Sequence, residues 1–269
     1  MIVSLDDFDC VCEVQGGGPA VTFLHSVGLS TREGWKYQIP QFSKTFKTLS
    51  FDFRGLGESS KGTKPLTVNQ YVNDIELLLE RQGIRQTVIM GASLGGFVAQ
   101  AFALKRPDLV SALVLVSTTC GHLPEHRERR AARTERIRKL GMASEVETQL
   151  QNQFSEQFIA DNPAIMDWYR HHYLLNDANH YADVLYDLGR MDFCERLREL
   201  RCPTLVVGGD SDRSVVAGRH PLDSPVRLRQ AIPDSNVAIL PGSRHYPQID
   251  NPDLFNQIVI SYLKTVLSA

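Results

Sequence analysis

The chain has 269 residues, 42% of them hydrophobic and 22% charged, which fits one large globular domain or one domain with an insert. Its formal net charge of −2 gives no general reason to expect nucleic acid as a partner. No apolar run approaches the roughly 18–20 residues that span a bilayer, and the first ten residues lack the basic start and apolar core of a signal peptide.

The five cysteines are an odd number and lie far apart, at positions 10, 12, 120, 194 and 202. Cys10 and Cys12 are two residues apart in a candidate strand, so both side chains point the same way. No second Cys or His pair follows at zinc spacing, so we expect no metal site. We expect reduced thiols and a cytoplasmic protein.

Strands and helices alternate through the first 120 residues. Residues 67–83 carry Val72, Ile75, Leu78 and Leu79 at helical spacing and end at a glycine. Continuous β-rich strands between helices predict a parallel sheet covered on both faces. We expect strands at 9–14 (an edge strand), 20–25, 46–53, 87–90 and 109–118, with helices at 35–42, 67–83 and 97–104.

The pattern then changes, because residues of about 121–190 contain no convincing strand. We expect helices at 125–140, 143–159, 164–174 and 179–189. Alternation resumes with strands in 202–210 and 236–242 and helices near 225–231 and 252–267. We therefore expect a core of residues 1–120 and 191–269, with a helical cap of residues 121–190 over the strand ends, where open α/β sheets bind ligands.

A strand breaks abruptly into Gly91-Ala92-Ser93-Leu94-Gly95 and resumes as a helix. Glycine has no Cβ and lets two backbones come close. Between a strand and a helix, Gly-x-Ser-x-Gly is the signature of a nucleophile elbow. A serine needs a base to become a good nucleophile, so an imidazole and an orienting acid are expected downstream.

His245 is the candidate base, since it alone among the eight histidines follows a late strand. The acid candidates are Asp210 and Asp212, at the end of the preceding strand, and the order Ser–Asp–His is that of a known triad. We expect surface or cap-lining roles for six other histidines: 122, 126, 171, 172, 180 and 220.

An acyl-transfer site also needs donors for the oxyanion. One should be the N–H of Leu94, after the nucleophile and at the start of a helix whose N-terminus favours negative charge. The loop His25-Ser26-Val27-Gly28 should supply the second, and we select Val27. His25 is then a loop-shaping residue and not a second base.

The motifs "FLHSVG", "FDFRGLGESS", "GASLGG", "CPTLVVGGDSD" and "GSRHYPQIDNPDLF" together resemble the α/β-hydrolase superfamily over nearly the whole chain. The resemblance implies an α/β-hydrolase fold, a mostly parallel sheet flanked by helices, with a helical cap inserted after the sixth strand. The family acid lies three residues after a glycine, as Asp212 does after Gly209. The family base follows Gly-x-Gly, whereas Arg244 replaces the second glycine here. A tight loop is implied for the Asp-x-Arg-Gly-x-Gly-x-Ser motif, which residues 52–59 match.

The His-Ser-x-Gly loop and the cap resemble 3-oxoadipate enol-lactone hydrolases and related esterases. That family's substrate is an anionic lactone, and residues 127–139 hold six arginines and one lysine against two glutamates. The simpler interpretation is a solvated helix face. In the functional interpretation, Arg130 and Arg133, which share a helix face, bind a carboxylate of the substrate. Trp168 is a further substrate-binding candidate. Of the aromatic pair common in the family, only Phe154 is kept.

The favoured function is a serine hydrolase of an ester or lactone, an anionic enol lactone among the candidates, without a cofactor. Alternatives are a carbon–carbon bond hydrolase of diketones, a cofactor-free oxygenase or perhydrolase, and a non-catalytic ligand-binding protein. The expected partner is a small molecule, with no nucleic acid and no membrane, and the sequence leaves a homo-oligomer open.

Overall fold

The structure, a computed structural model, describes residues 1–122, 124–214 and 220–268. Within them, eight strands form one sheet in the order β1-β2-β4-β3-β5-β6-β7-β8. From β4 to β8 all neighbours are parallel, whereas β2 is antiparallel to β4 and β1 to β2. The strands are β1 (Ile2–Leu5), β2 (Phe8–Gln15), β3 (Ala20–Leu24), β4 (Lys47–Phe51), β5 (Thr87–Ala92), β6 (Val110–Val116), β7 (Thr204–Gly209) and β8 (Ser235–Leu240).

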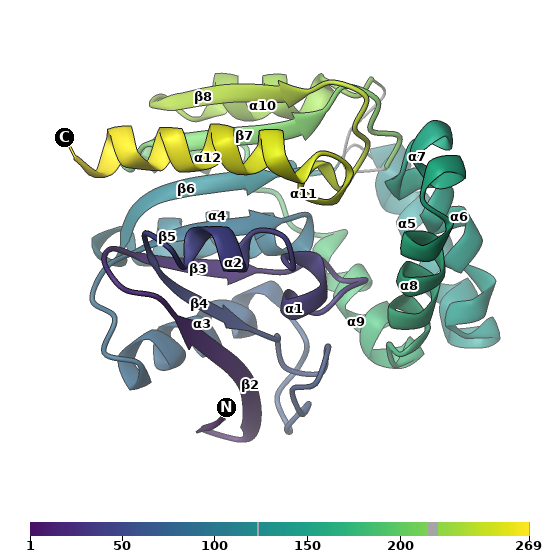
Figure 1. Ribbon diagram of the computed structural model, residues 1–269. Coiled ribbons are helices and arrows are strands. Elements are labelled where there is room, and N and C mark those ends of the chain that lie inside the picture. Colours follow the sequence, from purple (N-terminus) through teal and green to yellow (C-terminus); the bar gives the residue numbers. More distant parts are fainter. Residues whose placement is uncertain (123, 215–219, 269) are drawn as a thin grey trace.

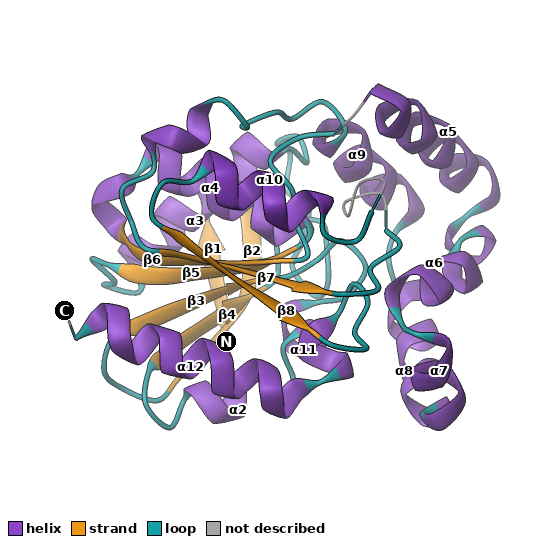
Figure 2. Ribbon diagram, turned by 90° about the horizontal axis from the view of Figure 1, so that it is seen from above, coloured by secondary structure: helices purple, strands orange, loops and turns teal. Residues whose placement is uncertain are grey.

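Helices cover both faces of the sheet, as Figure 2 shows from above. One face carries α3 (Val68–Arg81), α4 (Leu94–Lys105) and α10 (Asp223–Ala231). The other carries α2 (Ile39–Phe42) and α12 (Pro252–Leu267), near the short helices α1 (Thr31–Gly34) and α11 (Pro247–Asp250). Side chains alternate between the faces along each strand. Ile89 therefore packs beneath α3 and α4, whereas Val88 and Met90 belong to the core beneath α2 and α12.

In the described residues between β6 and β7, five α-helices lie together beyond the arrowheads of the parallel strands (Figure 1). They are α5 (Pro124–Leu140), α6 (Val146–Gln153), α7 (Glu156–Asp161), α8 (Pro163–Leu174) and α9 (Ala178–Leu188). We call α5–α9 the cap. Helix α5 packs along α9 and α6 along α8, while α9 also contacts α3 of the sheet. There the Val68 N–H donates to Asp187 Oδ2 over 2.8 Å.

Three details differ from the sequence-based expectation. The edge strand is β1, which the sequence analysis missed, and β2 lies inside it. Residues 35–42 form a turn followed by α2, because Pro40 lies in the first turn of that helix, where its missing N–H costs no hydrogen bond. The expected helix 143–159 breaks into a 3₁₀ turn (Met142–Ser144), α6 and α7, since Ser155 caps α7 by accepting from Phe158 N over 3.1 Å.

The loop after β4 is as tight as its motif implies. Asp52 accepts the Thr31 N–H over 2.7 Å and the Glu58 N–H over 2.9 Å. A Cβ on Gly57 would overlap the Asp52 carboxylate. The fully buried Arg54 guanidinium binds Asp74 through two hydrogen bonds of 2.6 and 2.7 Å, and this bidentate geometry holds the loop to α3.

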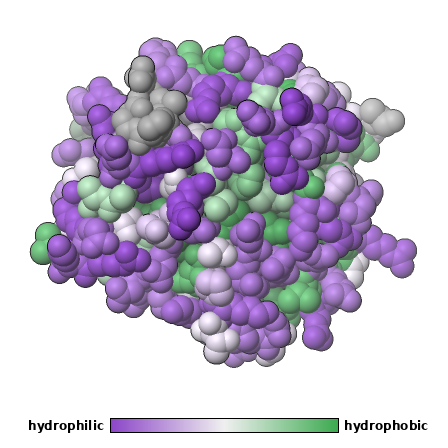
Figure 3. Space-filling view, turned by 180° about the vertical axis from the view of Figure 1, so that it is seen from behind, coloured by the Kyte–Doolittle hydropathy of each residue, from purple (hydrophilic) through white to green (hydrophobic). Residues whose placement is uncertain are grey.

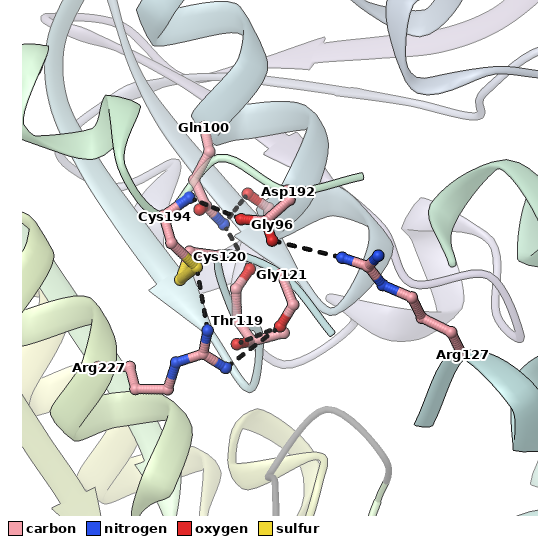
Figure 4. The surroundings of a disulfide bond; sticks show 9 residues. All are labelled: Gly96, Gln100, Thr119, Cys120, Gly121, Arg127, Asp192, Cys194 and Arg227. Atoms are coloured by element: carbon pink, nitrogen blue, oxygen red, sulfur yellow. Dashed lines mark hydrogen bonds and ion pairs between the residues drawn. A yellow bond between two sulfur atoms is a disulfide. The ribbon is translucent and has the colours of Figure 1, made fainter. Parts of the chain in front are cut away.

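A disulfide joins Cys120 to Cys194 across 74 residues of sequence, at the base of the cap (Figure 4). The expectation that all cysteines are reduced is wrong for this pair, which weakens the argument for a cytoplasmic location. Beside the disulfide, Gly121 and Asp192 form a single antiparallel β-bridge. The Arg227 guanidinium contacts both connections, at 3.4 Å from Gly121 O and 3.2 Å from Cys194 Sγ.

Most of the surface seen from behind is hydrophilic, with apolar side chains gathered near its middle (Figure 3). Among the described residues, no helix combines the length and apolar character needed to cross a membrane.

Replacing Cys120 and Cys194 together by Ala should lower the free energy of unfolding by about 2–4 kcal/mol, because the opened chain loses more entropy on folding. For a chain of this size the melting temperature should fall by roughly 5–10 °C. Thermal unfolding followed by circular dichroism measures the change. Dithiothreitol should shift the wild type similarly and leave the double variant unmoved. Cys202→Ala, which removes a free thiol, should still respond to the reductant; a wild type insensitive to reductant would contradict the prediction.

Candidate active site

Ser93 stands at a strained turn between β5 and α4. Its φ of 52° and ψ of −108° lie in a region that non-glycine residues rarely occupy. Such strain costs of order 1–3 kcal/mol and persists where surrounding contacts enforce it. Here Ser93 N donates to Val116 O over 2.9 Å, and Thr118 Oγ1 donates to Ser93 O over 2.9 Å.

The two glycines of the elbow allow backbones to touch. A Cβ on Gly91 would overlap Gly95 O, and a Cβ on Gly95 would overlap Leu24 O. The start of α4 therefore rests directly on the end of β3. Strands β3 and β5 are also neighbours, with Leu24 opposite Gly91. This is where the strand order reverses, the usual position of ligand sites in open α/β sheets.

The loop after β3 is fixed by His25, which is fully buried. The Phe53 N–H donates to His25 Nε2 over 2.9 Å, so that nitrogen accepts and the proton lies on Nδ1. Nδ1 then donates to Ser26 O over 2.6 Å. Burial lowers the pKa of His25, against the opposing charge of Asp52, which keeps the ring neutral. These contacts give His25 the loop-shaping geometry that the sequence suggested.

The expected oxyanion donors lie on adjoining segments. Leu94 begins α4, and Val27 lies in the loop after β3 on which α4 rests. Within the described residues, neither N–H makes a hydrogen bond to protein. Two uncommitted amides on adjoining segments, one at a helix N-terminus, are suited to receive an anionic oxygen.

His245 and Asp212 form a buried pair at the ends of neighbouring segments. His245 Nδ1 lies 2.9 Å from Asp212 Oδ2, and both residues are at most 5% exposed. Ser214 N donates to Asp212 Oδ1 over 2.8 Å, and Ser214 Oγ lies 3.0 Å from His245 Nδ1. Burial alone would raise the pKa of Asp212, but His245 and these hydrogen bonds lower it. The carboxylate is thus ionised and accepts a hydrogen bond from Nδ1, which leaves Nε2 as the ring nitrogen that does not face Asp212.

Asp212 and not Asp210 makes this contact. Asp210 is exposed and its Oδ1 accepts from Gly242 N over 3.0 Å. A Cβ on Gly209 would overlap Ser243 O and Arg244 O. The end of β7 therefore packs against the backbone that leads to His245, and a carboxylate three residues later reaches the imidazole.

The cap anchors the His245 loop. His245 N donates to Gln153 O over 3.0 Å, and Arg244 Nη1 donates to Phe154 O over 2.8 Å. Both acceptors lie at the end of α6. Arg244 stands where the superfamily usually has a glycine, and its buried side chain uses that position to bind the cap.

The Ser93 hydroxyl makes no hydrogen bond to another described residue, His245 included. Catalytic hydrogen bonds are often long or poorly aligned before substrate binds. The structure thus brings together two sets: Ser93 with the candidate oxyanion amides, and Asp212 with His245.

Aromatic side chains that the sequence analysis did not single out crowd the same region. Tyr246 OH lies 2.8 Å from Ser26 Oγ. Tyr173 approaches Gly28, whose added Cβ would lie 3.2 Å from the ring. The only feature of the sequence that could have placed Tyr246 near the site is its position next to His245. No feature of the sequence indicated Tyr173.

The cap candidates have different surroundings. Arg133 Nε lies 2.9 Å from Glu145 Oε2, and its Nη2 donates to Tyr181 OH over 2.9 Å. Although burial opposes it, Tyr181, Tyr173 and Glu145 raise the pKa of Arg133. Trp168 Nε1 donates to Glu33 Oε2 over 2.7 Å. Both Arg133 and Trp168 therefore have protein partners already.

Arg130 differs from Arg133, although both lie on one face of α5. It is 5% exposed and has no carboxylate partner among the described residues, and its Nε makes no hydrogen bond to them. Burial and the Arg133 charge lower the pKa of Arg130. The His122 ring nearby stacks on Phe97 of α4 at 5.3 Å. Neither nitrogen of His122 has a partner within the described chain, and burial with the Arg130 charge lowers the pKa of His122 to about 2.

A separate hollow of about 1160 Å³ lies between the loop after β4 and α8. Polar side chains such as Glu33, Lys36 and His172 line it, whereas the candidate nucleophile, acid and base do not. Its size therefore has no bearing on the chemistry of those three residues.

Comparisons with known proteins identify the architecture. Residues 19–252 match the family described as alpha/beta hydrolase fold. The chain is 28% identical over 252 residues to 3-oxoadipate enol-lactonase 2 of Acinetobacter baylyi, covering 93% of this chain and 90% of that protein. A malate-bound esterase from Thermogutta terrifontis has a TM-score of 0.90 at 25% identity, covering 99% of both chains. An enol-lactonase from Burkholderia xenovorans has a TM-score of 0.89 at 23% identity, covering 98% of this chain and 100% of the other.

Because the family pattern spans most of the sequence and these structures align along almost its entire length, the chain belongs to the α/β-hydrolase family.

Proposed function

We propose that the protein is a serine hydrolase of esters or lactones, with Ser93 as nucleophile, His245 as base and Asp212 as the orienting acid. The observation that carries the proposal is the buried Asp212–His245 hydrogen bond of 2.9 Å, in a chain whose elbow presents Ser93. The relationship to an enol-lactonase and an esterase supports the same class of substrate.

In the acylation step, His245 Nε2 takes the Ser93 hydroxyl proton as Oγ bonds to the acyl carbon. The carbonyl electron pair moves to oxygen, and the Val27 and Leu94 N–H groups stabilise the oxyanion. The bond to the leaving oxygen then breaks, and the imidazolium returns its proton to that oxygen. In a lactone the leaving hydroxyl stays on the same molecule.

In the deacylation step, His245 Nε2 takes a proton from water, whose oxygen attacks the acyl carbon. The second oxyanion collapses, the bond to Ser93 Oγ breaks, and Ser93 regains its proton from His245. Asp212 remains ionised throughout, holding the tautomer and stabilising the imidazolium. Its lowered pKa fits this part.

Ser93→Ala should reduce turnover of the best ester by about 10⁶-fold, as loss of a triad serine does elsewhere. The fold should survive, because alanine is smaller. Steady-state hydrolysis and labelling by a fluorophosphonate measure the two effects. The matched change Ser211→Ala should keep both activity and labelling. Activity of Ser93→Ala within tenfold of the wild type would show that the nucleophile is another group.

Asp212→Asn should lower kcat by about 10⁴-fold, because an amide favours the wrong imidazole tautomer. Asp210→Asn, two residues away and exposed, should remain near the wild-type rate. Parallel kcat measurements on one ester compare them. The reverse ranking would transfer the acid role to Asp210.

We further propose that the substrate carries a carboxylate, which Arg130 binds. Arg130 is buried without a carboxylate partner in the part of the chain that the structure describes, and a buried unpaired cation is costly. A substrate carboxylate would pair with its guanidinium bidentately. His122 is neutral, and neither of its ring nitrogens has a partner among the described residues, so the ring is free to donate a second hydrogen bond. The malate in the Thermogutta esterase structure is itself a carboxylate ligand. Arg133 is outside this proposal because it already pairs with Glu145.

Arg130→Gln should raise KM for a carboxylate-bearing lactone about ten- to a hundredfold, the range expected for a lost hydrogen bond to a charged group. KM for a neutral aryl ester should stay within about twofold of the wild type. The exposed neighbour provides a matched control, since Arg129→Gln should change neither value. Arg133→Gln should lower the melting temperature without selecting between substrates. Equal effects of Arg130→Gln on both substrates would assign Arg130 to cap stability.

A further inference from the structure

Tyr246 and Ser26 form a hydrogen bond between two segments that are 220 residues apart. The Tyr246 hydroxyl lies 2.8 Å from Ser26 Oγ, and both side chains are buried. Tyr246 directly follows His245, and Ser26 directly precedes Val27. The contact therefore joins the segment that carries the proposed base to the segment that carries a proposed oxyanion donor.

The geometry of a peptide bond makes Ser26 important for Val27. The Ser26 carbonyl and the Val27 N–H belong to one planar trans peptide unit and point in opposite directions. His25 Nδ1 holds the carbonyl end at 2.6 Å. Tyr246 holds the Ser26 side chain, which is attached to the Ser26 Cα. That Cα is one end of the same Ser26–Val27 peptide unit. Together the two contacts fix the direction of the Val27 N–H.

We propose that Tyr246 is a positioning residue for the oxyanion hole, acting through its hydrogen bond to Ser26 on the Val27 N–H. This rests on the proposed function of the site. A glycine at position 26 would offer no side chain to hold, whereas Ser26 lets this chain fix the loop with a pair of hydroxyl groups.

The surroundings of Tyr246 keep its hydroxyl in place. Its ring packs against Phe154 with centroids 5.7 Å apart and against Tyr169 at 6.3 Å. A Cβ on Gly28 would lie 3.7 Å from the Tyr246 hydroxyl, so the loop and the phenol lie close together. Burial raises the pKa of Tyr246, which leaves the phenol protonated at neutral pH.

Tyr169 supplies a matched control. It is fully buried, and its ring belongs to the same aromatic cluster. Its hydroxyl has no hydrogen-bond partner among the residues that the structure describes. Tyr169→Phe thus removes a phenolic oxygen from the same surroundings without breaking a hydrogen bond.

The test compares Tyr246→Phe, Tyr169→Phe, Ser26→Gly and the double variant Ser26→Gly/Tyr246→Phe. The readouts are kcat, KM, the inhibition constant of a trifluoromethyl ketone, whose adduct with serine carries an oxyanion, and the melting temperature. Tyr246→Phe should lower kcat about tenfold, the effect of one lost hydrogen bond. KM should change little, and ketone affinity should fall by the same factor as kcat.

Ser26→Gly should cause a similar loss, and the double variant should lose little more, because both changes break one contact. Tyr169→Phe should match the wild type in all kinetic readouts. The inference would be overturned if Tyr246→Phe kept the kcat and the ketone affinity of the wild type. It would also be overturned if Tyr169→Phe lost as much activity as Tyr246→Phe, or if the losses of the two single variants added up in the double variant. Should Tyr246→Phe fail to fold, Ser26→Gly alone decides, with Tyr246 intact.

Fluorophosphonate labelling separates this inference from the proposed function. If Ser93 of the wild type is labelled and Tyr246→Phe keeps its full rate, only the role of Tyr246 fails. If Ser93 is not labelled and the ketone does not inhibit the wild type, the serine mechanism fails, and the role of Tyr246 fails with it.

Discussion

The contact between the start of α4 and the end of β3 is the constraint on which the rest of the site depends. Backbone meets backbone there, since a Cβ on Gly95 would overlap Leu24 O. The contact places the strained Ser93 turn beside the loop after β3. It also places the Leu94 N–H, at the N-terminus of α4, near the loop after β3 that contains Val27. A larger residue at position 95 would push the helix and the loop apart, and both amides with them.

The cap is part of this arrangement and not only a cover. Gln153 and Phe154 of the cap accept hydrogen bonds from His245 and Arg244, so the imidazole loop is held by sheet and cap together. The Cys120–Cys194 disulfide joins the two segments that connect the cap to the sheet (Figure 4). The cap therefore also supports the His245 loop, because the end of α6 accepts a hydrogen bond from the His245 backbone.

The sequence by itself determined the features that depend on local pattern. The elbow could be predicted because two glycines around Ser93 stand between a β-branched run and an apolar helix. The residues left Asp210 and Asp212 open as the acid, and the resemblance to the α/β-hydrolase superfamily favoured Asp212, while position after a late strand indicated His245. Helix α3 could be predicted from apolar residues at helical spacing. Each of these signals lies within a few residues of the element that it predicts, and the alternation of elements then implied the parallel sheet.

Only the tertiary structure decided which distant groups meet. Helical spacing placed Arg130 and Arg133 on one face of α5, but Glu145, a residue of another segment, pairs with Arg133 and Arg136 and not with Arg130. Cys120 and Cys194 looked like isolated thiols because they lie 74 positions apart in the sequence, on either side of the cap. Tyr246 and Ser26 lie 220 residues apart in sequence and 2.8 Å apart in space. Periodicity states which way a side chain points relative to its own element, whereas its partner is set by how the elements pack, and that information is spread over the whole chain.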